Sequence, residues 1–138
     1  MPEEEFRRLA AFRMLLRRFQ SFSEQAAEAQ GLTSPQYQSL LAIKAHEGPA
    51  PFTVTVLAQR LLIKHNSAVG LVDRIEQLGL AVRTHPQSDR RSVVLRLTTK
   101  GKRILNRLAA QHRLELQRIA PELGRHADHF SATISTSG

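Results

Sequence analysis

The residues best suited to chemistry lie in one short stretch, 83–101, with the sequence RTHPQSDRRSVVLRLTTKG. Its middle part has no apolar residue except Pro86, so the polar side chains there cannot be packing a core. These side chains are His85, Asp89, Arg90 and Arg91. Arginine forms bidentate hydrogen bonds to phosphate and enters narrow minor grooves, so non-covalent binding of a polyanion is the chemistry to consider. Taken alone, the stretch is explained equally well as a solvated hairpin turn.

The same stretch predicts a β-hairpin that carries these side chains. Val93, Leu95 and Leu97 alternate with residues of mixed polarity, as in a strand with one buried face. Upstream, the pattern over 57–80 predicts two short helices separated by a break near 64–66. Two helices and a turn followed by a hairpin predict a winged helix-turn-helix.

The second of these helices, residues 66–78, is amphipathic. At about 100° per residue, its apolar face holds Ala68, Leu71, Val72, Ile75 and Leu78. The opposite face, the candidate surface for reading DNA, holds Asn66, Ser67, Gly70, Asp73, Arg74 and Gln77. Glycine inside a helix costs roughly 1 kcal/mol relative to alanine, so Gly70 indicates either close approach to a groove or chance.

The net charge favours a particular partner. The chain carries a formal charge of +8 at pH 7, and the segment from Arg60 to Arg107 accounts for all of it, with eleven Lys or Arg and three acids. A localised positive surface suits a polyanion. An anionic membrane would satisfy the same charge, but no basic amphipathic helix with exposed bulky apolar residues accompanies it. Nucleic acid is therefore the better partner, and no membrane contact is expected.

Length and composition exclude other classes. The chain has 138 residues, enough for one compact domain, and no cysteine, which excludes disulfides, zinc fingers and thiol redox sensing. It has no apolar run of about 18 residues, and its start, MPEEE, is acidic, so we expect a cytoplasmic, nucleoid-associated protein. Asp73 and Glu76 lie on a basic helix and are expected to pair with Arg74 or a wing arginine.

Catalysis and metal binding have little support. There is no glycine-rich phosphate loop and no nucleophile with a base, so we expect no enzyme and no cofactor. A surface zinc site is conceivable at His126, Asp128 and His129, with His112 earlier on the same predicted helix. No four-ligand set is visible, and we expect no functional metal.

Long helices are predicted on both sides of the winged segment. Residues 3–29 have an acidic N-terminus and a phenylalanine-rich stripe near heptad spacing, so this helix is either deeply buried or meets another subunit. Thr33 or Ser34, Thr53 or Thr55, and Thr98 or Thr99 are the expected caps of the later helices. Pro121 is expected to break or restart the last helix, and residues 131–138 to form a frayed tail. The fold class is mainly α with a small β-hairpin wing (α+β).

Several motifs occur in a fixed order along these elements. They are Gly31-Leu-Thr-x-x-Gln-Tyr-x-x-Leu-Leu41, Leu57-Ala-x-x-Leu61, Val72-Asp-Arg-Ile-Glu-Gln-Leu-Gly-Leu80, Asp89-Arg-Arg91 and Leu97-Thr-Thr-Lys-Gly101. In this order and spacing the chain resembles the MarR family of bacterial winged-helix transcription regulators, over about residues 30–105. The Asp-x-Arg wing followed by Leu-Thr-x-x-Gly is the most specific part.

The resemblance implies a homodimeric regulator of transcription. Two recognition helices would enter successive major grooves of a near-palindromic, inverted-repeat operator, with half-sites roughly 10 bp apart. Repression, relieved by a small aromatic or phenolic ligand, is the expected mode; the sequence does not identify the residues that would bind this effector. The implied parts are an N-terminal dimerisation helix (1–30), the winged helix-turn-helix (31–99), and C-terminal dimerisation helices with a tail (100–138), within one compact domain.

Carried over by position, the resemblance also implies roles for single residues. In the wing, Arg91 would enter the minor groove, Asp89 would orient it, and Arg90 occupies the variable middle position. Residues of the recognition helix would face bases and phosphates: Lys64, His65, Asn66, Ser67, Gly70 and Arg74. Ser34, Gln36 and Arg60 would add phosphate contacts.

The implied dimer interface involves both long helices, through Phe12, Leu16, Phe19, Leu123 and Phe130. The C-terminal part departs from the family pattern, because only residues 121 to about 134 remain for a last helix. The dimer would then depend more on the first helix, or the natural chain would extend further.

Two other functions remain open. The protein could be an architectural binder that ignores sequence, in which case it would bind operator and random duplex equally. It could also be a winged-helix module for protein interaction, without salt-dependent affinity for DNA. The localised charge disfavours the second, and the polar face with Asn66, Ser67 and Gln77 disfavours the first.

Overall fold

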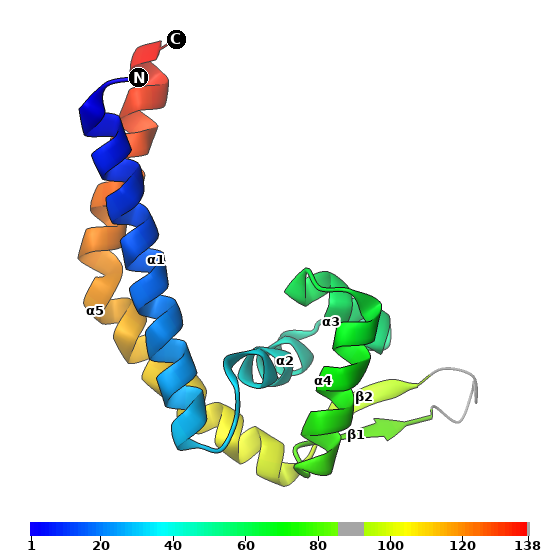
Figure 1. Cartoon of the computed structure of the whole chain (residues 1–138). Coiled ribbons are helices and arrows are strands. Elements are labelled where there is room, and N and C mark those ends of the chain that lie inside the picture. The colour runs from blue at the N-terminus through cyan, green and yellow to red at the C-terminus, as the bar shows by residue number, and fades with distance from the viewer. Residues whose placement is uncertain (86–92, 138) are drawn as a thin grey trace. The chain divides into compact units, whose positions relative to one another are not determined.

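The structure is a computed structural model that describes residues 1–85 and 93–137, with side chains described as far as Ala132. Its elements, in chain order, are α1 (Glu3–Ala29), α2 (Ser34–Ala45), α3 (Val54–Leu61), α4 (His65–Gln77), β1 (Ala81–Thr84), β2 (Val94–Leu97) and α5 (Thr99–Ser137) (Figure 1). The predicted fold class, mainly α with a small β-hairpin, is confirmed. None of the helices in the described part of the chain combines the length and the hydropathy that crossing a membrane requires.

Contacts divide the chain into two compact units. The winged unit comprises Ala27–Ala109, and the helical unit comprises Met1–Ala26 with Ala110–Gly138. The first division falls within the last turn of α1, and the second falls inside α5, between residues 109 and 110.

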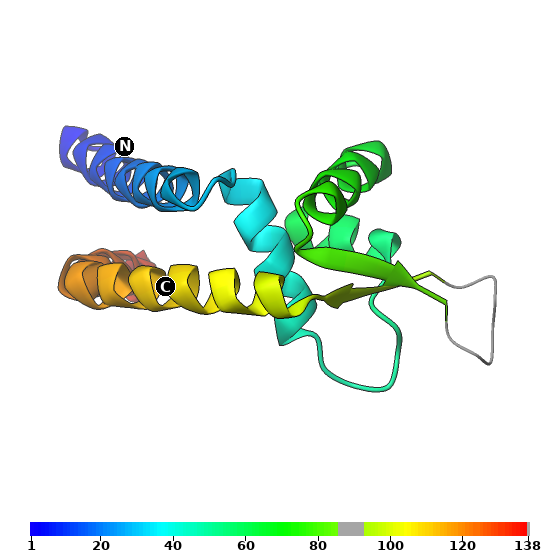
Figure 2. The same ribbon diagram turned by 90° about the horizontal axis from the view of Figure 1, so that it is seen from below.

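The winged unit is built around the predicted helix-turn-helix. Its core contains Phe52, Leu57, Ala58, Ala68, Val72 and Leu95, which come from α3, α4, β2 and the loop before α3. β1 and β2 pair antiparallel from Ala81 opposite Leu97 to Thr84 opposite Val94, and Figure 2 shows this hairpin beside α4. Leu95 is buried while Arg96 is exposed, as the alternating pattern predicted.

Threonine hydroxyls fix the starts of three helices. Thr33 accepts a hydrogen bond from the backbone N–H of Gln36, whose side chain accepts one from the N–H of Thr33, and together they form a capping box. Thr53 accepts from the N–H of Val56 at the start of α3. Thr98 accepts from the N–H of Gly101 and donates to the carbonyl of Gly79. Each predicted pair of cap candidates therefore has its first member as the cap: Thr33, Thr53 and Thr98.

The helical unit consists of α1 and the second part of α5, which lie side by side and antiparallel (Figure 1). Phe12 packs edge-on against His126 and Phe130, at ring-centroid distances of 5.6 and 6.1 Å. Further along, Phe19 and Phe22 pack against the buried ring of His112. These rings account for much of the phenylalanine in α1.

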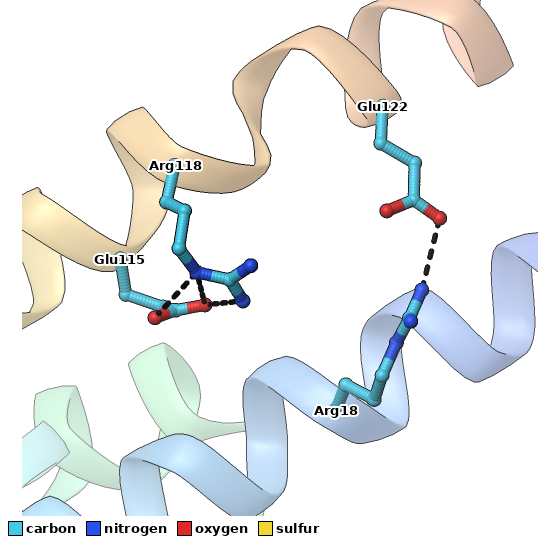
Figure 3. A network of polar contacts seen from close by, with 4 residues as sticks. All are labelled: Arg18, Glu115, Arg118 and Glu122. Atoms are coloured by element: carbon cyan, nitrogen blue, oxygen red, sulfur yellow. Dashed lines mark hydrogen bonds and ion pairs between the residues drawn. The ribbon is translucent and has the colours of Figure 1, made fainter.

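Polar contacts add to this helix pair. The guanidinium of Arg18 on α1 donates to the carboxylate of Glu122 on α5 over 2.9 Å, and His129 Nε2 lies 2.9 Å from Glu5 Oε1 (Figure 3 shows the first pair). Within α5, Arg118 donates to Glu115. This hydrogen bond lowers the pKa of the Glu115 carboxyl below 4.5.

The C-terminal part differs from the prediction. α5 is one helix of 39 residues that runs through Pro121 to Ser137, so the predicted break at Pro121 and the frayed tail from residue 131 are wrong. Pro121 is exposed, so water can bond to the carbonyl oxygen that the missing N–H leaves without a helical donor. Once a helix is formed, each further residue adds a hydrogen bond without a new nucleation cost, which explains the extension through weak helix formers. The last helix is therefore longer than the sequence suggested.

Candidate nucleic-acid interface

The surface predicted to read DNA lies on α4, and its burial pattern matches the helical wheel. Ala68, Val72 and Ile75 are buried. The opposite face is exposed throughout: Asn66, Ser67, Gly70, Asp73, Arg74 and Gln77, with His65 at the start of the helix. The apolar face thus holds α4 on the winged unit and leaves its polar face to solvent.

The N-terminus of α4 is suited to an anion. Lys64 occupies the N-cap position, is exposed, and makes no side-chain capping hydrogen bond. The backbone N–H groups of a first helical turn have no partner within the helix, and the helix dipole places partial positive charge there. Lys64 and His65 at this position are exposed, and so is Arg60 in the last turn of α3, four residues before Lys64 in the sequence. Phosphate is an anion that such a terminus binds.

Arg83 on β1 connects the hairpin to α4. Its guanidinium donates to Asp73 over 2.6 Å and to Glu76 over 2.7 Å, and its backbone N–H donates to Glu76 over 3.1 Å. The hydrogen bond to Asp73 is the main cause of the raised pKa of Arg83. The expected pairing of both acids with a wing arginine is thereby confirmed, whereas Arg74 donates to Gln77 over 3.4 Å.

The tip of the wing falls outside the described residues. Asp89, Arg90 and Arg91, which the resemblance assigns to the minor groove, lie there, and their roles stay predictions. The strands on either side are described and pair in register, with Thr84 opposite Val94. His85, the last described residue before the tip, is exposed.

Two of the residues expected to contact phosphate are buried. Ser34 is 1% exposed and Gln36 is 7% exposed. The Ser34 hydroxyl accepts from the Gln38 amide, and the Gln36 side chain is part of the capping box with Thr33. Their burial contradicts the expected phosphate contacts: the positions near the start of α2 that suggested a DNA contact serve to begin the helix.

One unusual residue of this surface was missed in the sequence. Leu62, in the turn between α3 and α4, has a left-handed backbone conformation (φ 56°) and is 92% exposed. Neither property has a signal in hydrophobic periodicity, because the turn belongs to neither helix. The helix-turn-helix was predicted from the sequence, but the backbone conformation and the exposure of Leu62 in its turn are seen only in the structure.

The residues predicted for dimerisation divide into two groups. Phe12, Phe19 and Phe130 are half-buried and pack within the helical unit. Leu16 and Leu123 are 41% and 39% exposed. The two leucines are therefore more exposed than the three phenylalanines.

The histidines considered as metal ligands have other neighbours. His126 lies 3.9 Å from Glu122, His129 contacts Glu5, and His112 contacts Ser23 over 2.9 Å. Over residues 1–85 and 93–137 no group of three or more His, Asp or Glu has a geometry that could hold a metal ion.

Three short helices, the last with an exposed polar face, followed by an antiparallel hairpin, define a winged helix-turn-helix protein. A family model described as "MarR family" matches residues 30–92. Over this segment the chain is similar to the MarR family.

Individual relatives agree with this similarity. The "Uncharacterized HTH-type transcriptional regulator YfiV" of Bacillus subtilis (strain 168) is 32% identical over 95 residues, which cover 66% of this chain and 58% of the relative. The "HTH-type transcriptional repressor MdtR" of the same organism is 33% identical over 87 residues, covering 63% and 54%. The chain thus spans a little over half the length of these two curated relatives.

Solved structures show the same fold. A Staphylococcus aureus MepR–DNA complex has a TM-score of 0.73 at 20% identity, with 93% of each chain covered. CouR from Rhodococcus jostii RHA1, bound to p-coumaroyl-CoA, has a TM-score of 0.70 at 22% identity, with 89% of this chain and 88% of CouR covered.

Proposed function

We propose that the protein is a homodimeric transcription regulator that binds double-stranded DNA at a near-palindromic operator, and that it acts as a repressor. The observation that carries the proposal is the exposed polar face of α4, whose opposite, apolar face is buried in the winged unit. This helix lies in the segment that accounts for the whole net charge of +8. Asn66, Ser67 and Gln77 can hydrogen-bond to base edges, while Lys64, Arg60 and Arg74 can bind phosphates.

The proposed contacts have separate roles. Lys64 and the first N–H groups of α4 would bind a backbone phosphate and so fix the position of the helix. Asn66 has the donor and acceptor geometry to bind adenine in the major groove. In the wing, Arg91 would enter the minor groove with Asp89 orienting it, and Arg90 would contact the backbone. Ser34 and Gln36 have no part in this interface because they are buried.

Dimerisation is supported by apolar surface on the helical unit. Exposed side chains on α1 are Phe6 (53%), Leu9 (44%), Met14 (53%) and Leu16 (41%), and those on α5 are Leu114 (67%), Leu116 (44%) and Leu123 (39%). So many large apolar side chains on two packed helices indicate a surface that another chain covers. A second copy of this chain would bring two recognition helices to one operator.

Repression and release by a ligand are supported by relatives. MdtR is named a repressor, and CouR has been solved with an aromatic acyl-CoA. By analogy, we propose that a small aromatic or phenolic ligand releases this protein from its operator.

The proposed function is tested by selecting duplexes from a random pool at about 150 mM salt, where non-specific binding is weak. Recovery of an inverted repeat with half-sites roughly 10 bp apart is the expected result. An architectural binder would enrich no sequence, and a protein-interaction module would show no salt-dependent binding to any duplex. Either outcome would reject the proposal.

A further inference from the structure

Two residues in the segment 62–70, which comprises the turn before α4 and the first half of that helix, lower the stability of the protein without improving its packing. They are Leu62 and Gly70. We call residues 62–70 the recognition segment. For each residue, an equivalent position elsewhere in the chain shows what the fold alone requires.

Gly70 lies in the middle of α4, where glycine destabilises a helix relative to alanine. A Cβ atom added at Gly70 would meet no atom within 4 Å, so internal packing does not require glycine. At Gly101 the opposite holds, because an added Cβ would lie 2.0 Å from the backbone oxygen of Leu80. The fold therefore explains Gly101 but not Gly70.

Leu62 occupies a position where the fold favours glycine. α1, α3 and α4 end with the same type of hydrogen bond, in which a backbone N–H donates to the carbonyl oxygen five residues earlier. The pairs are Leu32 to Ala27, Ile63 to Ala58, and Leu80 to Ile75. The residue before each of these has a positive φ, and in two cases it is glycine, Gly31 and Gly79. At the end of α3 it is Leu62, which is strained in this conformation.

The side chain of Leu62 gains nothing from the fold in return. It is 92% exposed, more than any other large apolar side chain among the described residues. Strained backbone with an exposed apolar side chain points to a contact outside the chain. Lys64 and His65, two and three residues further on, lie at the basic N-terminus of α4, so DNA bound there would pass next to Leu62.

We propose that Gly70 and Leu62 both make direct contact with DNA. Gly70 is the position of closest approach: its bare Cα, one turn from both Asn66 and Arg74, lets the polar face of α4 come near the base edges. Leu62 places its side chain against an apolar part of the DNA, either the methyl group of a thymine or a deoxyribose ring. This inference rests on the proposed function; it gives Gly70 the specific role of closest approach and adds Leu62 to the residues that determine the fit to the operator.

The role of Gly70 is tested with Gly70→Ala and a matched control, Gly124→Ala. Gly124 is also exposed within a helix, α5, and an added Cβ there meets no atom within 4 Å. Both variants are expected to raise the thermal unfolding midpoint, because alanine favours the helix. Only Gly70→Ala should weaken binding to the duplex recovered by selection, by about tenfold or more. Binding of Gly70→Ala equal to that of Gly124→Ala would overturn this role.

The role of Leu62 is tested with Leu62→Gly and Leu62→Ala. Leu62→Gly removes the strain and should raise the unfolding midpoint, whereas Leu62→Ala keeps the strained residue and should not. Both lose the side chain and should weaken operator binding several-fold. Unchanged or tighter binding by both variants would reject the contact.

The source of the apolar contact follows from modified duplexes. Deoxyuridine, which lacks the thymine methyl group, replaces each thymine of the recovered duplex in turn. Contact with a methyl group predicts one position where the substitution weakens wild-type binding but not that of Leu62→Gly. If Leu62 contacts deoxyribose, Leu62→Gly should bind all of these duplexes more weakly than the wild type does, and by the same factor.

Failure of this inference is distinguishable from failure of the proposed function. A wild-type protein that binds no selected duplex rejects both. A wild-type protein that binds its operator while the Gly70 and Leu62 variants bind equally well rejects this inference alone.

Discussion

Arg83 on β1 donates a hydrogen bond to Asp73 on α4 over 2.6 Å, so the first strand of the wing is tied to the proposed recognition helix. A second bond, to Glu76, holds the same guanidinium from the next turn of α4. Arg83 is only 28% exposed at its side chain, so it is engaged within the protein rather than displayed to DNA. The two parts of the proposed interface are in this way fixed to one another within the winged unit.

This relationship predicts the sign of an effect on DNA binding. Asp73→Asn removes a negative charge from the interface, and long-range attraction alone would then make DNA binding tighter. We expect weaker binding, because Arg83 loses a partner and the hairpin is less firmly placed. The partly exposed ion pair between Arg83 and Asp73 should contribute about 0.2 to 1 kcal/mol to the free energy of unfolding, a range that already includes solvent screening. Fluorescence anisotropy with the recovered duplex and urea unfolding would measure both effects, and tighter binding by Asp73→Asn would refute a positioning role.

The close approach at Gly101 predicts a large loss of stability. In Gly101→Ala the new methyl carbon would lie 2.0 Å from the Leu80 oxygen, so α5 or the connection between α4 and β1 must shift. Strain of this kind costs roughly 1 to 3 kcal/mol or more. Urea unfolding should show this loss in Gly101→Ala and none in Gly124→Ala.

Different residues of the recognition segment should determine sequence specificity and electrostatic attraction to DNA. Asn66→Ala should cost roughly 1 to 3 kcal/mol at one base pair and relax the preference there, while Lys64→Ala should weaken binding to all duplexes and reduce the salt slope by about one. Titrations at several salt concentrations, with operator and scrambled duplexes, distinguish the two. The same outcome for both variants would mean that α4 contacts only the DNA backbone.

Self-association should depend on the exposed apolar side chains of the helical unit. Leu16→Glu places a charge on that surface and should shift sedimentation toward the monomer, because a charge buried in an interface without a partner is costly. Gln111→Glu introduces the same side chain at an exposed polar position of α5 and should leave the association state unchanged. Dimerisation by Leu16→Glu equal to that of the wild type would place the interface elsewhere.

The contact between Glu115 and Arg118 predicts a small dependence of stability on acid. The pKa of Glu115 is lowered in the folded protein by the hydrogen bond from Arg118. Its contribution is therefore fully present above pH 4.5, the ordinary value, and is lost as pH falls below it through the lowered pKa. Glu115→Gln should accordingly show a shallower fall of the unfolding midpoint between about pH 5 and pH 3 than the wild type does. Parallel slopes would mean that the pair does not contribute.

Much of the fold follows from local patterns. The helix predicted over 3–29 and the amphipathic wheel of α4 match the structure, because both depend on periodic burial along one element. The break at Pro121 was predicted from proline chemistry alone, and the helix passes through it at an exposed position. Ser34 and Gln36 looked suited to phosphate, yet the start of α2 uses and buries them. Their surroundings are set by tertiary packing, which the local sequence does not contain.

The proposed interface was less accessible to prediction than the fold. Charge counting located the segment, and the helical wheel selected the face of α4. Leu62 was missed because its exposure and its backbone conformation arise at the end of α3, where periodicity carries no information. The roles of Asp89, Arg90 and Arg91 stay predictions from resemblance.

The most direct test of the central claim compares the affinity of the protein for the recovered inverted repeat and for a scrambled duplex at about 150 mM salt, with the stoichiometry of each complex measured by sedimentation. A dimeric regulator predicts two chains on each inverted repeat and a preference of about a thousandfold or more over the scrambled duplex. Equal affinity for both duplexes, falling together as salt rises, would contradict the claim that α4 reads sequence.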